Sequence, residues 1–227
     1  MRLRLIVATS ALLLGPIGSA AAAPVLEPLK PCYQSLGEDL RQRETIELRA
    51  HDFTPLGTVD VLIDGKPALT GGTVDAFGAI KASVSVPYQA DGERTFSVTL
   101  TERENPANTV TATAMVSDLT VALRPKEARS SSRVRFRGRG FTGPSAVYGH
   151  YLQVRPDGTR RLRRTVRLAR PAGTCGTFEV RRRQIPLQRP RTGLWVLQVD
   201  QQRDYAPDPA SAKVEVEIRV TRTFRDV

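Results

Sequence analysis

One pattern occurs twice in this chain, and it restricts the possible folds more than any other feature. Its first copy, IELRAHDFTP at residues 46–55, is followed by an Asp-Gly turn at 64–65, and its second copy, VRFRGRGFTGP at 134–144, is followed by Asp-Gly at 157–158. A strand, a Phe-Thr corner, a second strand and a turn thus recur in the same order, with the two corners 88 residues apart. This spacing is the length of one small domain, so the repeat predicts two similar β units in tandem.

Short segments that alternate apolar with polar or small residues run along both copies, as half-buried strands do. In the first copy the predicted strands are 45–49, 59–63, 80–86, 95–100 and 109–116. In the second copy they are 121–123, 134–138, 148–154, 162–168, 178–180, 194–199 and 214–220. Turn residues separate them, and no window beyond the first residues has an apolar period of 3.6. We therefore expect an all-β fold built from β-sandwiches.

The first 23 residues have the three parts of a secretory signal peptide. Arg2 and Arg4 make the start basic, residues 5–17 are apolar but too few to span a bilayer, and residues 18–23 are small. We expect residues 1–23 to be removed on export. The mature chain would then be secreted, and extracellular or loosely associated with the cell envelope. We expect no transmembrane segment, because no later segment reaches the ~18 apolar residues of a membrane span.

The net charge of +11 hides a division between the two copies. Residues 24–117 contain 8 Lys and Arg against 13 Asp and Glu, a net charge of −5, whereas residues 119–227 contain 24 against 9, a net charge of +15. We therefore predict an acidic first domain, 24–117, and a strongly basic second domain, 118–227. A GC-rich coding bias would favour arginine over lysine throughout the chain, but it would not place the excess in one domain.

Arginines of the second domain follow the period of its strands. Four of them alternate with Val134, Phe136 and Gly138, so a strand would point all four to one face. Arg161, Arg163 and Arg167 form a second run that alternates in the same way. Arg181, Arg182 and Arg183 form a third, continuous run. The ten arginines, predicted to contact a polyanion, are Arg133, Arg135, Arg137, Arg139, Arg161, Arg163, Arg167, Arg181, Arg182 and Arg183. Whether the three runs adjoin depends on strand order, and a solvated arginine-rich exterior is the alternative interpretation.

Cys32 and Cys175 are the two cysteines of the chain, one in each predicted domain. Exported proteins fold in an oxidising environment, where cysteines pair. A disulfide here would close a loop of well over one hundred residues, for which the chain-entropy estimate is about 5 kcal/mol. Two buried, unpaired thiols are the other interpretation, and the sequence leaves both open.

The motif GRGFTGP at 138–144, followed by a hairpin with an Asp-Gly turn, resembles the immunoglobulin-like repeats, including the IPT/TIG group, of secreted and surface bacterial proteins. The first copy departs from it, with Ala50, His51 and Asp52 in place of Gly-x-Gly. The resemblance covers most of residues 30–220. It implies two tandem immunoglobulin-like β-sandwich domains after a signal peptide, and roles as spacers, adhesins or wall-binding and carbohydrate-binding accessories. The family has no common catalytic residues to carry over.

Catalytic motifs are scarce in this sequence. It has two histidines, and it lacks Cys-x-x-Cys, His-x-x-x-His, Gly-x-Ser-x-Gly and phosphate-loop patterns. We therefore expect a protein that is not an enzyme and that needs no cofactor or metal. Asp60, Asp64 and Asp75 could border one calcium-binding loop cluster, but their spacing matches no known loop, and solvated turn acids are the alternative.

These observations predict a secreted, non-enzymatic protein that contacts the cell envelope or an extracellular polyanion through its arginine-rich second domain. The expected partner is an anionic cell-wall polymer or an acidic polysaccharide, since no motif for a specific nucleic acid is present. The alternative is a structural or protein-interaction spacer whose positive charge is incidental. The sequence does not identify protein partners.

Overall fold

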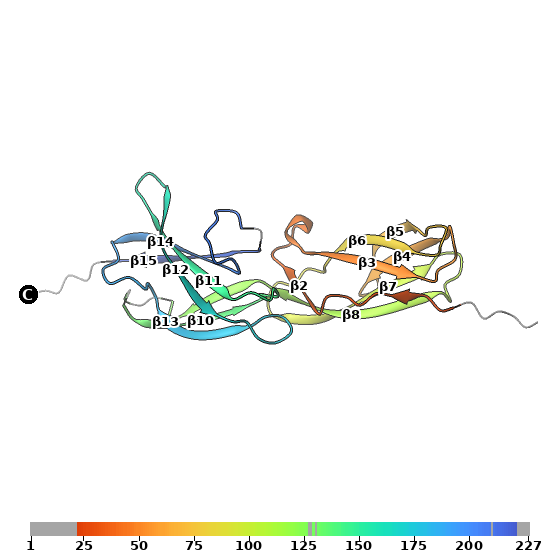
Figure 1. Cartoon of the computed structure of the whole chain (residues 1–227), viewed down its shortest axis with the longest axis horizontal. Helices are drawn as coiled ribbons and strands as arrows, with labels where there is room; N and C mark the ends of the chain where they lie inside the picture. The colour runs from red at the N-terminus through yellow and green to blue at the C-terminus, as the bar shows by residue number, and fades with distance from the viewer. Residues whose placement is uncertain (1–21, 127–128, 130, 210, 222–227) are drawn as a thin grey trace, which may run out of the picture.

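The computed structural model describes residues 22–126, 129, 131–209 and 211–221, which form an almost entirely β structure (Figure 1). The sole regular element in these residues that is not a strand is a short 3₁₀ helix, η1 (Leu40–Gln42). This confirms the predicted all-β sandwich fold. Of the predicted signal peptide, 1–23, all but the last two residues lie outside the described residues.

The N-terminal half, residues 22–118, packs two sheets against each other. Its strands are β1 (Val25–Leu26), β2 (Cys32–Ser35), β3 (Thr45–His51), β4 (Thr58–Ile63), β5 (Lys66–Thr73), β6 (Ile80–Ser85), β7 (Glu93–Glu102) and β8 (Thr109–Asp118). One sheet has the order β1-β3-β6 and the other β2-β8-β7-β4-β5, with β2 parallel to β8 and the other pairs antiparallel. Alternate residues of β3, such as Ile46 and Leu48, face β4 and β7 residues such as Val61 and Phe96 in one apolar core.

The C-terminal half, residues 119–221, repeats this two-layer arrangement. Its strands are β9 (Thr120–Arg124), β10 (Arg133–Arg139), β11 (Val147–Val154), β12 (Arg160–Ala169), β13 (Phe178–Arg183), β14 (Gly193–Asp200) and β15 (Val214–Val220). The sheets are β13-β10-β9 and β12-β11-β14-β15, and all pairs are antiparallel. Phe136 of β10 and Trp195 of β14 are fully buried in its core, which shares no residue with the core of the N-terminal half.

The two Phe-Thr corners are equivalent in three dimensions. The backbone N–H of Phe53 donates to the carbonyl of Gly78 at 3.1 Å, and that of Phe141 donates to the carbonyl of Gly176 at 3.1 Å. Both accepting glycines have positive φ, as do the residues that precede the two phenylalanines, Asp52 at 66° and Gly140 at 84°. Aspartate tolerates this left-handed region better than most residues. The first copy therefore keeps the corner although it lacks the Gly-x-Gly motif.

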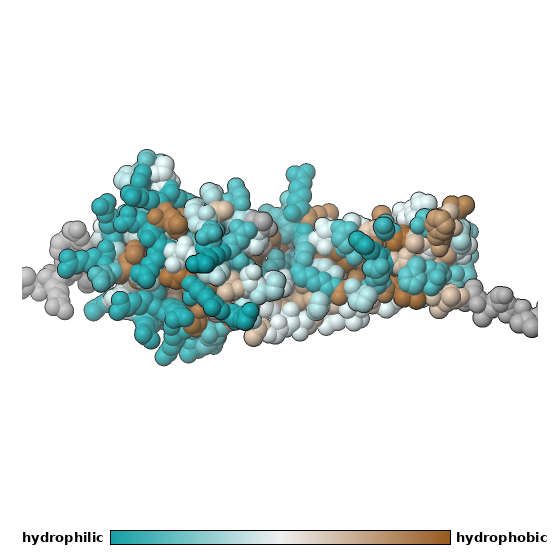
Figure 2. All heavy atoms as spheres, viewed as in Figure 1, coloured by the Kyte–Doolittle hydropathy of each residue, from teal (hydrophilic) through white to brown (hydrophobic). Residues whose placement is uncertain are grey.

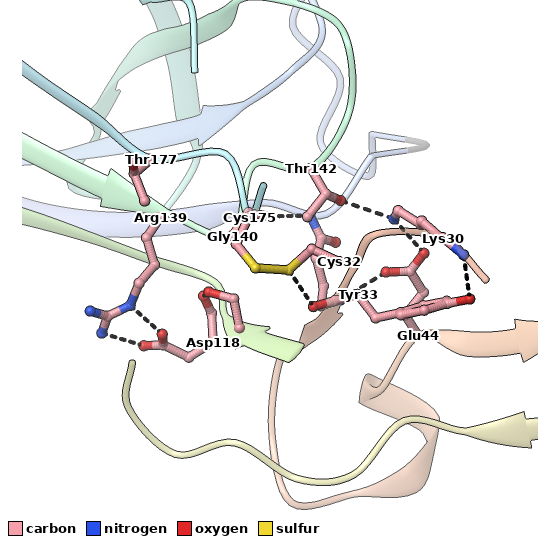
Figure 3. The surroundings of a disulfide bond; sticks show 12 residues. Lys30, Cys32, Tyr33, Glu44, Asp118, Arg139, Gly140, Thr142, Cys175 and Thr177 are labelled. Carbon is pink, nitrogen blue, oxygen red and sulfur yellow. Dashed lines mark hydrogen bonds and ion pairs between the residues drawn. A yellow bond between two sulfur atoms is a disulfide. The ribbon is translucent and has the colours of Figure 1, made fainter. Parts of the chain in front are cut away.

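The halves lie end to end along the long axis of the molecule, and β8 ends only two residues before β9 begins (Figure 1). A disulfide joins Cys32 of β2 to Cys175, across a sequence separation of 143 and with the two Cα atoms 5.2 Å apart (Figure 3). The paired interpretation of the cysteines is thus confirmed. Near the disulfide, Lys30 Nζ donates to Thr142 Oγ1 at 3.0 Å and to Glu44 Oε1 at 2.7 Å.

Arg139 is held at this junction by acids. Its guanidinium group donates to both carboxylate oxygens of Asp118, the last residue of β8, and to the carboxylate of Asp91 in the loop between β6 and β7 (Figure 3 shows the Asp118 contact). The hydrogen bonds that Arg139 donates to Asp118 raise the pKa of Arg139 above its ordinary value. Arg139 therefore ties the basic half to the acidic one.

Within the described residues, no helix is long and apolar enough to cross a membrane.

Candidate functional site

Strand β10 presents a row of arginines to solvent. Its residues alternate between exposed or half-buried arginine and buried apolar residues or glycine, so Arg133, Arg135, Arg137 and Arg139 point to one face of the sheet, as predicted. This alternation is a local property of an extended chain with one side against the core. The buried side contributes Val134 to the core between the sheets.

The register of the sheet brings further arginines beside this row. Arg183 and Arg181 of β13 lie directly opposite Arg133 and Arg135, and Arg124 of β9 lies opposite Arg135 on the other side. Directly opposed residues share a face, and like charges so placed repel each other. We call this surface the arginine face; it consists of Arg124, Arg133, Arg135, Arg137, Arg181 and Arg183.

Acidic residues form ion pairs with only some of the ten arginines predicted to contact a polyanion. Glu179, opposite Arg137 on β13, pairs with Arg135 at 3.1 Å and with Arg137 at 2.6 Å, and Arg139 is occupied at the junction. Seven predicted arginines form no ion pair within the described residues: Arg133, Arg161, Arg163, Arg167, Arg181, Arg182 and Arg183.

The arginines of β12 depart from the predicted alternation. The register between β11 and β12 shifts twice, so Arg161 lies opposite Gln153 whereas Arg167 lies opposite Tyr148. Gln153 and Tyr148 are an odd number of residues apart on β11 and therefore point to opposite faces. The expectation that Arg161, Arg163 and Arg167 share one face is wrong, because the bulge opposite Tyr151 and Leu152 inserts one extra residue into β12 between Arg161 and Arg167.

A cleft with a volume of about 310 Å³ opens between the edges of the two sheets of the C-terminal half, where β12 and β13 lie side by side. Five predicted arginines line it: Arg133, Arg167, Arg181, Arg182 and Arg183. We call it the arginine cleft. A hydrogen bond of 3.5 Å from Arg182 to the carbonyl of Leu168 links β13 to β12. The other five predicted arginines do not line this cleft; Arg137 and Arg139 line a separate hollow near the junction.

Tyr151 also lines the arginine cleft, and its role was not foreseen from the sequence. Its side chain is 1% exposed, and its hydroxyl group has no hydrogen-bond partner within the described residues. Burial raises the pKa of this phenol well above its ordinary value. The sequence predicts that Tyr148 and Tyr151 point to opposite faces of a strand, but it does not show which arginines come close to the buried one.

A second polar cluster lies on the outer face of the sheet β12-β11-β14-β15. His150 is fully buried there and contacts Asp200 Oδ1 at 3.3 Å and Thr165 Oγ1 at 2.9 Å. Burial alone would raise the pKa of Asp200, but hydrogen bonds from His150, Gln198 and the backbone of Gln202 hold it below its ordinary value. The carbonyls of Gln202 and Ala206 accept hydrogen bonds from this cluster, so it holds the connection from β14 to β15 on the sheet.

The three aspartates considered for calcium lie in separate contacts. Asp60 accepts hydrogen bonds from Arg103 and the backbone of Gly71, and Asp64 accepts them from Arg94 and the backbone of Ser97. Asp75 caps its own turn. Across the described residues, no three His, Cys, Asp or Glu side chains gather as a metal site would require. Asp64 and Asp75 lie at turns, whereas Asp60 lies in strand β4.

The surfaces of the two halves differ in hydropathy. Hydrophilic side chains gather over the C-terminal half, whereas the visible side of the N-terminal half is paler and shows more hydrophobic areas (Figure 2). The arginine face and the arginine cleft belong to the more hydrophilic half.

No family model matches this chain, and no curated protein matches it. The resemblance to IPT/TIG repeats therefore stays a prediction.

Among solved structures, a β-glucuronidase from Parabacteroides merdae is 9% identical, with 87% of this chain and 24% of that chain covered and a TM-score of 0.30. The tetra-tandem repeat of the extending region of a large adhesion protein is 15% identical. The match covers 87% of this chain and 49% of that chain, with a TM-score of 0.29. The Bacteroides ovatus protein SGBP-B, solved with a mixed-linkage heptasaccharide, is 14% identical, with 88% and 48% covered and a TM-score of 0.25. This chain thus spans half or less of their lengths, and likenesses this weak do not bear on its function.

Proposed function

We propose that this chain is a secreted, non-enzymatic protein of two tandem immunoglobulin-like domains, 24–117 and 118–227, that binds an anionic polymer of the cell envelope or an acidic extracellular polysaccharide. The observation that carries the proposal is the convergence of five predicted arginines on one cleft, none of them in an ion pair within the described residues. Guanidinium groups suit such a ligand because each presents paired donors in a plane to phosphate, sulfate or carboxylate.

The arrangement of the arginine face supports this function energetically. Arg133 opposes Arg183 and Arg135 opposes Arg181, and each like-charged cross-strand pair destabilises the sheet by a few tenths of a kcal/mol or more. A bound polyanion would remove this repulsion. The net charge of +15 on residues 119–227 would also raise the rate at which an anionic polymer meets the protein.

Export of the chain rests on two independent observations. The first residues read as a signal peptide, and a buried disulfide is typical of proteins that fold outside the reducing cytosol. An anionic envelope polymer or acidic polysaccharide would be present in that location.

Binding of the mature chain to teichoic acid, heparin and polygalacturonate across a salt series tests the proposal. If five or more anionic groups bind at once, affinity should fall by about two orders of magnitude between about 50 and about 200 mM salt. The variant R181S/R182S/R183S should bind on the order of tenfold more weakly, since each exposed charge contributes about 0.5 kcal/mol. These side chains are exposed, so the fold should remain.

A matched control separates the surface from the net charge. The variant R49S/K66S/K81S removes the same three charges from exposed positions in the N-terminal half. It should bind as the wild type does. Equal losses in the two variants, or an affinity that does not change with salt, would contradict the proposal.

The spacer function is the second candidate, and the junction favours it. The disulfide, the Lys30 contacts and the Arg139 contacts hold the two halves end to end, as a rod-like connector requires. Arg135 and Arg137 share Glu179, so part of the positive charge is already balanced. This function predicts no binding of the three polymers at any salt concentration.

A further inference from the structure

The hydroxyl group of Tyr151 is in an unfavourable place for a purely structural side chain. It is buried, and within the described residues no group donates a hydrogen bond to it or accepts one from it. A buried hydroxyl without a partner costs free energy, whereas phenylalanine would fill the same core position without that cost. Tyr151 is one of the residues that line the arginine cleft, so a ligand that enters this cleft is the candidate partner of the hydroxyl.

The groups that line the arginine cleft define the chemistry of that partner. Five arginines line the cleft and no acidic residue does, so its charged groups are all hydrogen-bond donors with positive charge. A phenol is protonated at neutral pH, and burial raises the pKa of Tyr151 further, so its hydroxyl adds another donor. A cleft with these donors is complementary to an oxyanion.

We propose that the arginine cleft is a socket for one oxyanion group of a polymer, a sulfate ester, a phosphodiester or a carboxylate, to which the Tyr151 hydroxyl donates a hydrogen bond. The polymer is the one in the proposed function, so this inference rests on it. The other arginines of the face would contact neighbouring charges along the chain of the polymer. The socket adds specificity to an otherwise electrostatic surface, since a phenol donor acts only at short range.

The size of the arginine cleft and the contacts of its side chains suit a small charged group of a ligand. About 310 Å³ is at the lower end of the range for ligand pockets, enough for one substituent and part of the unit that carries it. The hydrogen bond between Arg182 and the Leu168 carbonyl is 3.5 Å long, beyond the usual range for N–H···O bonds. Arg182 can therefore exchange this carbonyl for a charged oxygen, which forms a stronger bond with a guanidinium group.

Replacing Tyr151 with phenylalanine in the full mature chain tests the socket, because the change removes only the hydroxyl group. Y151F should bind the polymer that the wild type prefers about tenfold more weakly, as expected for loss of a hydrogen bond to a charged group. Its thermal stability should be equal or higher, since an unpartnered polar atom leaves the core. A hydroxyl with only a structural role would give the opposite result, a less stable protein with unchanged affinity.

Tyr88→Phe is the matched control, because it removes a phenol from an exposed side chain of the N-terminal half. It should change neither affinity nor stability. Teichoic acid, heparin and polygalacturonate distinguish phosphodiester, sulfate and carboxylate as the group that enters the socket. The largest effect of Y151F is expected for one of the three.

Titration with inorganic sulfate and phosphate separates this proposal from the proposed function. If Y151F binds every polymer and both inorganic anions as the wild type does, the socket is wrong while salt-dependent polymer binding still stands. If the wild type binds an inorganic anion through Tyr151 but no polymer, the socket stands and the polymer function is wrong. If it binds neither polymer nor inorganic anion, both proposals are wrong.

Discussion

At the scale of single residues, two glycines control how closely the backbone packs at the junction. Gly176 has a φ of +64°, and a Cβ atom there would overlap the carbonyl group of Phe141. Gly140 has a φ of +84°, and a Cβ atom there would overlap the carbonyl group of Asp118, at the end of β8. The Gly-x-Gly-Phe-Thr motif therefore has a physical cause: one glycine lets the corner approach the preceding half of the chain.

Gly176→Ala should lower the free energy of unfolding by about 3 kcal/mol or more, because left-handed strain adds to a backbone clash. Gly158 is the matched control, with a similar φ of +80° and open space around its Cα. Gly158→Ala should cost only about 1 kcal/mol, from the strain alone. Urea unfolding of the two variants measures the difference, and equal losses would show that the corner tolerates a side chain.

At the scale of elements, the neighbouring strands decide what the row of arginines on β10 can do. Alternation along β10 is predictable from the sequence because side-chain direction in a strand depends only on position. The opposition of Arg135 to both Arg181 and Arg124 is not predictable, because it depends on which strands pair with β10 and in which register. One of the two bulges in β12 lies between Arg161 and Arg167 and turns them to opposite faces, and nothing in the spacing of these arginines indicates a bulge.

Glu179 is the acid that balances the arginine face, so its removal should strengthen polyanion binding. Glu179→Gln frees Arg135 and Arg137 and should raise affinity on the order of threefold, with less than about 1 kcal/mol change in stability, as is usual for exposed ion pairs. Glu217→Gln makes the same charge change on β15, at an exposed position in the other sheet. Equal gains in a binding assay would mean that net charge, and not the arginine face, determines affinity.

At the scale of the whole molecule, the two halves have separate cores but a covalent junction. Each core is built from its own two sheets, so neither half needs the other to bury its apolar residues. The disulfide and the contacts of Lys30 and Arg139 instead restrict how the halves move relative to each other. The junction thereby holds the arginine face at a constant orientation to the acidic half.

Loss of the disulfide should destabilise the chain without removing its β structure. In the chain-entropy model a loop of 143 residues corresponds to about 5 kcal/mol, an upper value here because each half has its own core. The C32S/C175S variant should therefore melt lower by on the order of 10 °C and keep its far-ultraviolet circular dichroism. A reductant should lower the melting temperature of the wild type and leave that of the variant unchanged. An unchanged melting temperature in the reduced wild type would contradict this role.

The all-β class, most of the strands and the direction of the β10 arginines followed from the sequence alone, because alternation and turn chemistry act over a few neighbouring residues. Strands β1, β2 and β5 were missed: the first two are only two and four residues long, and most of β5 is exposed and lacks alternation. Only the tertiary structure brought Cys32 to Cys175, placed β12 beside β13 and put Tyr151 on the arginine cleft. Each of these depends on packing between segments far apart in the chain, which no local pattern encodes.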